Sequence, residues 1–198
     1  MRRIVASATL VVGLGSSTNT HAEDSATDRS AALDVVSSRE TTWAWAWRGI
    51  FAADAIGEGA LILAASSRAD RIDLLSGVFK STVALGATFV FPLAAVGDWR
   101  SRATTDAEIS ALLDRAAEKE AEGRAWPMHV LNIGFNVAVG GIAGEWSGRW
   151  STAILGTIVG IGVGELELIT QPKSAIDAAK STVHVIAGPT FLGLAGSF

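Results

Sequence analysis

The stretch that decides the fold is 156-GTIVGIGVGELELITQP-172, an apolar run with a glycine at every fourth position, followed by two glutamates. Gly156, Gly160 and Gly164 share one side of a helix, because residues four apart point the same way at 3.6 residues per turn. In lipid, helices associate through close backbone approach at small residues. The stripe therefore predicts a helix-packing surface in a membrane helix, with Glu165 and Glu167 near its end.

The composition of the whole chain agrees with a lipid environment. Of its 198 residues, 49% are hydrophobic and 18% are charged, and the mean hydropathy is +0.35. The length suits one domain. The net charge is -4 and Lys and Arg do not cluster, which argues against a nucleic-acid partner. There is no cysteine, so a disulfide framework and a thiolate metal site are both excluded.

The beginning of the chain has the pattern of a secretory signal peptide over residues 1–22. Two arginines precede an apolar run from Ile4 to Leu14, and a polar segment ends at Ala22. The run is too short to span a bilayer, which takes roughly 20 apolar residues. Residues 23–42 are polar with charges of both signs, and they predict a mobile leader.

Four apolar stretches follow, at about 43–66, 74–97, 125–146 and 150–171. Each is close to the length of a helix that crosses a hydrocarbon core of about 30 Å. The separators are short after the first and third stretches and long after the second. We therefore predict an all-α fold, in which a membrane-embedded bundle of four helices in two hairpins forms one domain over residues 43–198.

The long separator predicts an amphipathic connector helix over about 105–123. Thr105 and Glu108 have the spacing of a capping box, and Gly123 is a typical helix stop. Apolar residues recur between them at helical spacing, and charged residues fill the other side. We expect this helix to lie on its own domain rather than to bind a partner.

The tryptophans all lie at the ends of the apolar stretches. Indole rings favour the headgroup level of a bilayer, so this distribution predicts interfacial positions for all of them. The seven residues are Trp43, Trp45, Trp47, Trp99, Trp126, Trp146 and Trp150.

Polar residues within the apolar stretches form two clusters at matched depths. A turn near residue 69 places Glu58 level with Lys80, and a turn near residue 148 places His129 level with Glu167. Together they define a predicted polar seam of Asp54, Glu58, Lys80, His129, Asn132, Asn136, Glu165 and Glu167. Such a seam either moves protons or ions, or supplies interhelical polar contacts that fix the helix register.

A second architecture fits part of the pattern. Apolar residues alternate with small or polar ones over 83–91 and 132–141, and the chain ends in Phe198. The signal peptide, the alternation and this terminal aromatic residue resemble outer-membrane β-barrels, which are the alternative fold. In either architecture the last stretch, 181–198, is interrupted by Gly188-Pro189 and predicts a short irregular or strand-like tail.

The sequence contains no catalytic signature, so we expect no enzyme, no cofactor and no metal site. We expect a structural or assembly component of a bacterial-type cell envelope, in the inner rather than the outer membrane. It would contact the lipid bilayer and a membrane-protein partner or a second copy. The alternative is a small ion or proton transport protein. The orientation stays open: export of the N-terminus leaves nine Lys and Arg outside and three inside, against the positive-inside rule.

Overall fold

The computed structural model describes residues 18–181, 184–188 and 191–195. The part of the predicted signal peptide before residue 18 lies outside the described residues. The helices are α1 Thr18–Ala64, α2 Arg68–Val90, the short 3-10 helix η1 Trp99–Ser101, α3 Asp106–Gly123, α4 Trp126–Ser147, α5 Trp150–Thr170 and α6 Ser174–Ser181. The tail, predicted to be irregular or strand-like, forms an antiparallel pair of strands, β1 His184–Gly188 and β2 Phe191–Ala195.

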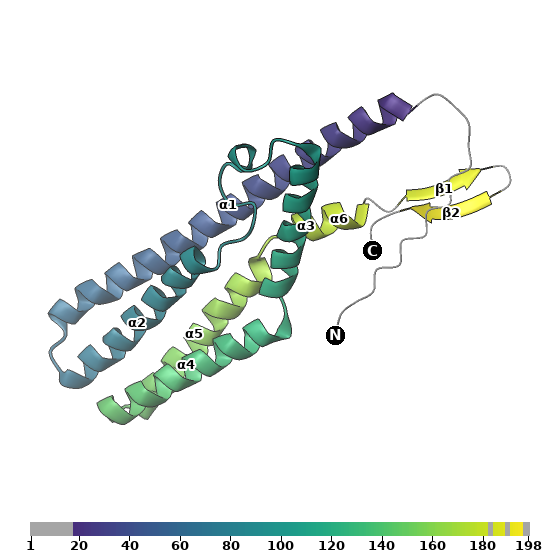
Figure 1. Ribbon diagram of the computed structural model, residues 1–198. Helices are drawn as coiled ribbons and strands as arrows, with labels where there is room; N and C mark the ends of the chain where they lie inside the picture. The colour runs from purple at the N-terminus through teal and green to yellow at the C-terminus, as the bar shows by residue number, and fades with distance from the viewer. Residues whose placement is uncertain (1–17, 182–183, 189–190, 196–198) are drawn as a thin grey trace.

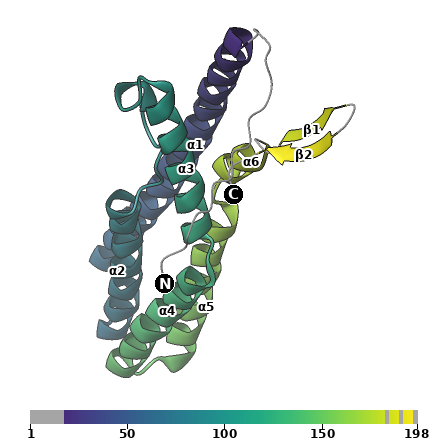
Figure 2. The same cartoon turned by 45° about the vertical axis from the view of Figure 1, so that its right-hand side comes forward.

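Two helical hairpins lie side by side and form most of the molecule (Figures 1 and 2). The first hairpin is α1 with α2, the second is α4 with α5, and α2 packs against α4 between them. The predicted helical bundle of two hairpins is therefore confirmed. The barrel alternative is wrong, because residues 83–90 lie in α2 and residues 132–141 lie in α4.

The second helix begins and ends earlier than the predicted stretch 74–97. It begins at Arg68 because Ser67 caps it: the Ser67 hydroxyl oxygen accepts the backbone N–H of Asp70 at 3.0 Å. It ends at Val90 because Pro92 disfavours helical geometry at the residue before it. The chain after Val90 therefore leaves the helix and continues along α1 toward the start of that helix, where Gly97 N–H donates to Thr41 and the Trp99 indole donates to Asp34.

The segment predicted to be a mobile leader, 23–42, is helical instead. It belongs to α1, which is 47 residues long and continues well beyond the end of α2 (Figure 1). Within it Leu33, Val36 and Glu40 are almost fully buried. The prediction failed because it used local polarity alone, whereas α3, α6 and the chain after α2 pack on this part of α1 and order it.

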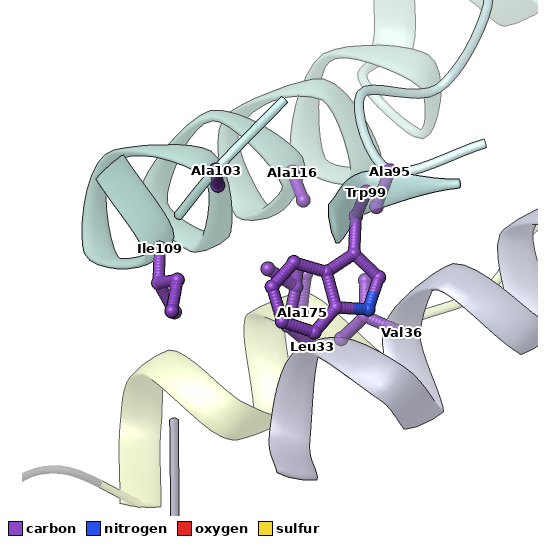
Figure 3. Close-up of a cluster of buried hydrophobic side chains, with 8 residues drawn as sticks. All are labelled: Leu33, Val36, Ala95, Trp99, Ala103, Ile109, Ala116 and Ala175. Atoms are coloured by element: carbon purple, nitrogen blue, oxygen red, sulfur yellow. The ribbon is translucent and has the colours of Figure 1, made fainter. Parts of the chain in front are cut away.

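These elements enclose a small apolar core, which we call the head (Figure 3). The head comprises residues 27–42 of α1, residues 91–105, α3 and α6. Its buried side chains are Leu33, Val36, Ala95, Trp99, Ala103, Ile109, Ala116 and Ala175. Trp99 is only 5% exposed and packs inside this core, and its predicted interfacial position stays a prediction. The indole N–H has a partner inside the head, since it donates to Asp34 at 2.8 Å.

The connector helix α3 lies on this core, as expected from its pattern. Its capping box is complete: Thr105 Oγ1 accepts the N–H of Glu108 at 3.3 Å, and the Glu108 carboxylate accepts the N–H of Thr105 at 3.0 Å. Leu112 and Leu113 pack against the buried residues of the head. The apolar side of α3 is thus covered by its own chain.

The remaining part, residues 43–64 of α1 with α2, α4 and α5, is the bundle, and many of its large apolar side chains are exposed. Large apolar side chains point outward: Leu63 is 89% exposed and Ile56 is 72% exposed. Polar side chains lie inside, among them Arg48, Ser81 and Asn136. Among the described residues, two stretches are long and apolar enough to cross a membrane, judged by length and composition alone: Arg68–Val90 and Trp150–Ala179. The predicted spans at about 43–66 and 125–146 are not among them.

Candidate functional site

A cavity of about 690 Å³ lies between the two hairpins, and we call it the groove. All four bundle helices contribute to its walls. Part of the lining is apolar, with Phe51 from α1, Val83 from α2, Phe135 from α4 and Val159 from α5. The polar and charged lining residues are Asp54, Glu58, Asp73, Ser76, Lys80, Ser81, Asn132, Asn136 and Glu167. Both predicted polar clusters thus contribute to a single cavity.

The glycine stripe of α5 forms one wall of the groove. Gly156, Gly160 and Gly164 line it, and Glu167 continues the same side of the helix. A methyl group at Gly160 would overlap Asn136 Oδ1, and one at Gly164 would overlap Asn132 Oδ1. The stripe is therefore needed by the second hairpin itself, because it makes room for two amide side chains of α4.

A hydrogen-bonded network joins α4 to α5 beside the groove. His129 Nδ1 lies 2.6 Å from Glu165 Oε2, and Asn132 Nδ2 donates to Glu165 Oε1 at 2.9 Å. Asn136 Nδ2 donates to Asn132 Oδ1 at 3.0 Å. The sequence placed His129 level with Glu167, but the structure pairs it with Glu165. His129 and Glu165 do not line the groove.

Lys80 connects the two hairpins instead of pairing with Glu58. Its ammonium group donates to the carbonyl oxygen of Gly156 at 2.9 Å. In the described part of the chain no ion pair joins Lys80 to Glu58. The Glu58 carboxylate lies over Gly77, where a methyl group would overlap it. Asp54, one helical turn before Glu58, accepts a hydrogen bond from the hydroxyl of Ser81.

Several acceptor atoms of the groove have no hydrogen-bond donor. Asn136 is 4% exposed, yet its Oδ1 atom has no partner. The same holds for Glu58 Oε2 and Asp73 Oδ1. Nor does any hydrogen bond or ion pair within residues 18–181 reach the carboxylate of Glu167. Buried polar atoms normally have partners, so the groove is short of donors.

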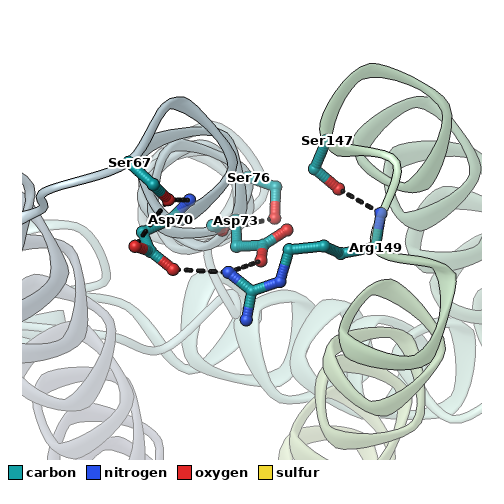
Figure 4. A network of polar contacts seen from close by, with 6 residues as sticks. All are labelled: Ser67, Asp70, Asp73, Ser76, Ser147 and Arg149. Atoms are coloured by element: carbon teal, nitrogen blue, oxygen red, sulfur yellow. Dashed lines mark hydrogen bonds and ion pairs between the residues drawn. The ribbon is translucent and has the colours of Figure 1, made fainter.

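The turns of the two hairpins are tied together at the end of the bundle that is far from the head (Figure 4). Arg149 of the second turn bonds to Asp70 and lies 3.4 Å from Asp73 Oδ2. Ser67 donates to Asp70 at 2.6 Å. The sequence prediction did not include Asp73. It lies among charged residues, which indicate a solvent-exposed turn.

The tryptophans other than Trp99 lie at the two ends of the bundle. Trp43 and Trp47 donate to Thr170 Oγ1 at 3.4 and 3.1 Å and so join α1 to the end of α5 nearest the head. Trp47 is largely buried there. The exposed indoles are Trp45 and Trp126 at this end, with Trp146 and Trp150 at the turn.

The head buries two glutamates that the sequence prediction did not single out. Glu120 holds the start of α6, because its carboxylate accepts the N–H groups of Ala175 at 2.9 Å and Ile176 at 3.0 Å. Glu40 accepts the N–H of Ala95 at 2.6 Å. Burial raises the pKa of Glu40 to about 7; the hydrogen bond from Ala95 opposes this rise and the charge of Glu120 adds to it.

Among the described residues, no three His, Asp or Glu side chains are grouped so as to hold a metal ion. Comparisons with protein-family models, with curated proteins and with solved structures find no match.

Proposed function

We propose that this chain is an integral membrane protein of the cell envelope and serves as a structural or assembly component. The bundle lies in the lipid, and the head lies at the aqueous face. The observation that carries this proposal is the exposed apolar surface of the bundle, where Leu63 and Ile56 point outward while the polar side chain of Asn136 points inward. In water, each Å² of exposed apolar surface costs about 25 cal/mol, whereas lipid removes that cost.

The dimensions of the second hairpin support the same proposal. Its helices α4 and α5 have 22 and 21 residues. At 1.5 Å per residue they are about 33 and 32 Å long, close to the thickness of a hydrocarbon core. Exposed indoles at both ends, Trp126 at one and Trp146 with Trp150 at the other, suit the two headgroup levels.

A structural role is supported by the polar contacts that hold the hairpins together at three depths. Trp47 bonds to Thr170 near the head, and Lys80 bonds to Gly156 in the middle. Arg149 bonds to Asp70 at the turns. In lipid, such contacts fix the relative position of helices that have little hydrophobic drive to associate. The outward apolar side chains are then free to contact lipid or a membrane-protein partner.

The experiment that tests this proposal is fractionation of cells that express the full chain. We expect the protein in the membrane pellet after an alkaline carbonate wash, and a helical circular dichroism spectrum after detergent extraction. Recovery in the soluble fraction after detergent-free lysis would contradict the proposal.

A second function, movement of protons or small ions, is favoured by the carboxylates of Glu58 and Glu167 in the groove. Intramembrane carboxylates are costly and commonly lie on ion pathways. In proteoliposomes that contain the purified chain, Glu58→Gln should abolish a flux that the unchanged chain supports. Glu165→Gln should reduce it less, because Glu165 lies outside the groove. Equal flux in all three proteins would remove this function.

A further inference from the structure

We infer that the groove binds an organic ammonium cation, a small molecule with N–H donors on a positive charge and an apolar body. This inference depends on the proposed membrane-embedded fold, and it names a ligand class for the groove. It goes beyond a structural role, which requires no ligand.

The charges that line the groove favour a cation. Four carboxylates belong to its walls, those of Asp54, Glu58, Asp73 and Glu167, and they face a single cation, Lys80. Arg149 neutralises part of this charge by its approach to Asp73 from the turn. The remaining excess is negative, and an anion or a neutral acceptor would meet repulsion or no partner.

The hydrogen-bonding atoms left open in the groove are all acceptors. Asn136 Oδ1 is the sharpest case, because this side chain is 4% exposed and lines the groove while its oxygen has no donor. Glu58 Oε2 is likewise buried without a donor. A ligand that brings N–H groups would satisfy these atoms, whereas one that brings only oxygen acceptors would not.

The shape and the lining exclude a bare metal ion as the best fit. The carboxylates are spread along the groove, and within the described chain they do not group as metal ligands do. From Gly156 to Glu167 the α5 wall rises by about 16 Å. The cavity of about 690 Å³ also carries apolar side chains, among them Phe51, Phe135 and Val83. An organic body fills such a space and contacts these side chains.

Lys80 already shows how the groove receives an alkylammonium group. Its aliphatic stem passes between the hairpins, and its Nζ atom donates to the carbonyl oxygen of Gly156 at 2.9 Å. An external ammonium ion would be held in the same manner by Glu58 and Asn136 or by Glu167. Lys80 and the ligand then together neutralise the negative charge of the groove.

The first test uses the unchanged full chain, purified in detergent, and compares three probes of similar size by calorimetric titration. Benzylammonium should bind at least about tenfold more tightly than benzyl alcohol, its neutral counterpart, and benzoate should not bind. Sodium ions at physiological concentration should not displace benzylammonium. Equal affinity for the alcohol and the ammonium ion, or displacement by sodium alone, would overturn the inference.

The second test changes the groove by one charge at a time. Glu58→Gln and Glu167→Gln should each weaken benzylammonium binding by about tenfold or more. Glu145→Gln is the matched control, because Glu145 is exposed on α4 and does not line the groove. Circular dichroism and elution volume check that each variant is folded. Undiminished binding in both groove variants would overturn the inference.

The two proposals fail in different ways. A chain that pellets with membranes but does not distinguish benzylammonium from benzyl alcohol keeps the structural role and loses the ligand. A chain recovered in the soluble fraction loses the membrane-embedded fold as well.

Discussion

The head buries a cluster of apolar side chains, whereas many large apolar side chains of the bundle are exposed, although both regions are helical and share α1. In the head, Leu33 and Val36 of α1 are hidden. Farther along the same helix, Ile56 and Leu63 are exposed, and across the bundle Asn136 is hidden. One continuous helix thus buries its apolar side chains near one end and exposes them near the other. The change falls near Trp43 and Trp47, where the indole N–H groups reach the end of α5.

The two regions also differ in how they treat buried polar atoms. In the head, Glu120 receives two backbone N–H groups and Glu40 receives one. In the bundle, Asn136 Oδ1 and Glu58 Oε2 receive none. Both buried carboxylates of the head thus bind backbone N–H groups, although Glu40 Oε1 has no partner, whereas Asn136 Oδ1 and Glu58 Oε2 leave the groove with unpaired acceptors.

The largest effect is expected from emptying the core of the head. Trp99→Ala removes the largest side chain of that core and should lower the free energy of unfolding of the head by about 3–5 kcal/mol. Urea unfolding in detergent, monitored by hydrogen exchange of the α3 amides, measures this loss of stability. Trp126→Ala is the matched control, because Trp126 is 73% exposed. Equal losses in both variants would show that Trp99 is not part of a core.

A smaller effect is expected from filling the glycine stripe of the bundle. Gly160→Leu forces a side chain against Asn136 and should cost about 1–3 kcal/mol in unfolding by sodium dodecyl sulfate titration. Gly162→Leu, two residues along the same helix, meets no atom within 4 Å and should cost much less. If Gly162→Leu proved the more damaging change, the assignment of the packing side of α5 would be wrong.

The next effect is a pH dependence confined to the head. The pKa of Glu40 is about 7 in the folded chain against an ordinary value of 4.5, so the folded state holds the proton more tightly. Stability is then highest below about pH 4.5 for this group and falls as the pH rises to about 7. The fall is at most about 3 kcal/mol. Urea unfolding at several pH values measures it, and Glu40→Gln should flatten the curve; an unchanged slope would contradict this assignment.

The smallest effect is expected at the turns that Figure 4 draws. Arg149→Ala removes the ion pair with Asp70, whose partners are both partly exposed. We expect a slight drop in the melting temperature at low salt and none at about 1 M salt, where charges are screened within about 3 Å. A large drop that persists in high salt would mean that Arg149 holds the hairpins by packing rather than by charge.

The bundle was predictable from the sequence because its signals are local or follow from helix geometry. Length and apolarity marked its helices, and short separators marked the hairpins. The capping box of Thr105 and Glu108 marked α3 in the same way. The sequence did not decide which of Glu165 and Glu167 faces the groove. Residues two apart on a helix point about 200° apart, and only packing decides which one faces the groove.

The head was not predictable, because its core joins residues that are distant in the sequence. Leu33 and Val36 stand in a polar segment whose composition predicts mobility. Their burial requires Trp99 and Ala175 to pack on them, from 63 to 142 positions away. The groove was predictable only in part. Matching the depths of polar residues on paired helices identified both polar clusters. The packing of α2 on α4, which makes both clusters line one cavity, could not be predicted.

The most direct test of the central claim is the accessibility of nitroxide labels in lipid vesicles that hold the full chain. A label at Ile158, which is 62% exposed on α5, should be relaxed by oxygen and shielded from a polar nickel complex. A label at Ala107, exposed on α3 of the head, should show the reverse preference. If the nickel complex reached Ile158 as readily as Ala107, the bundle would not lie in lipid.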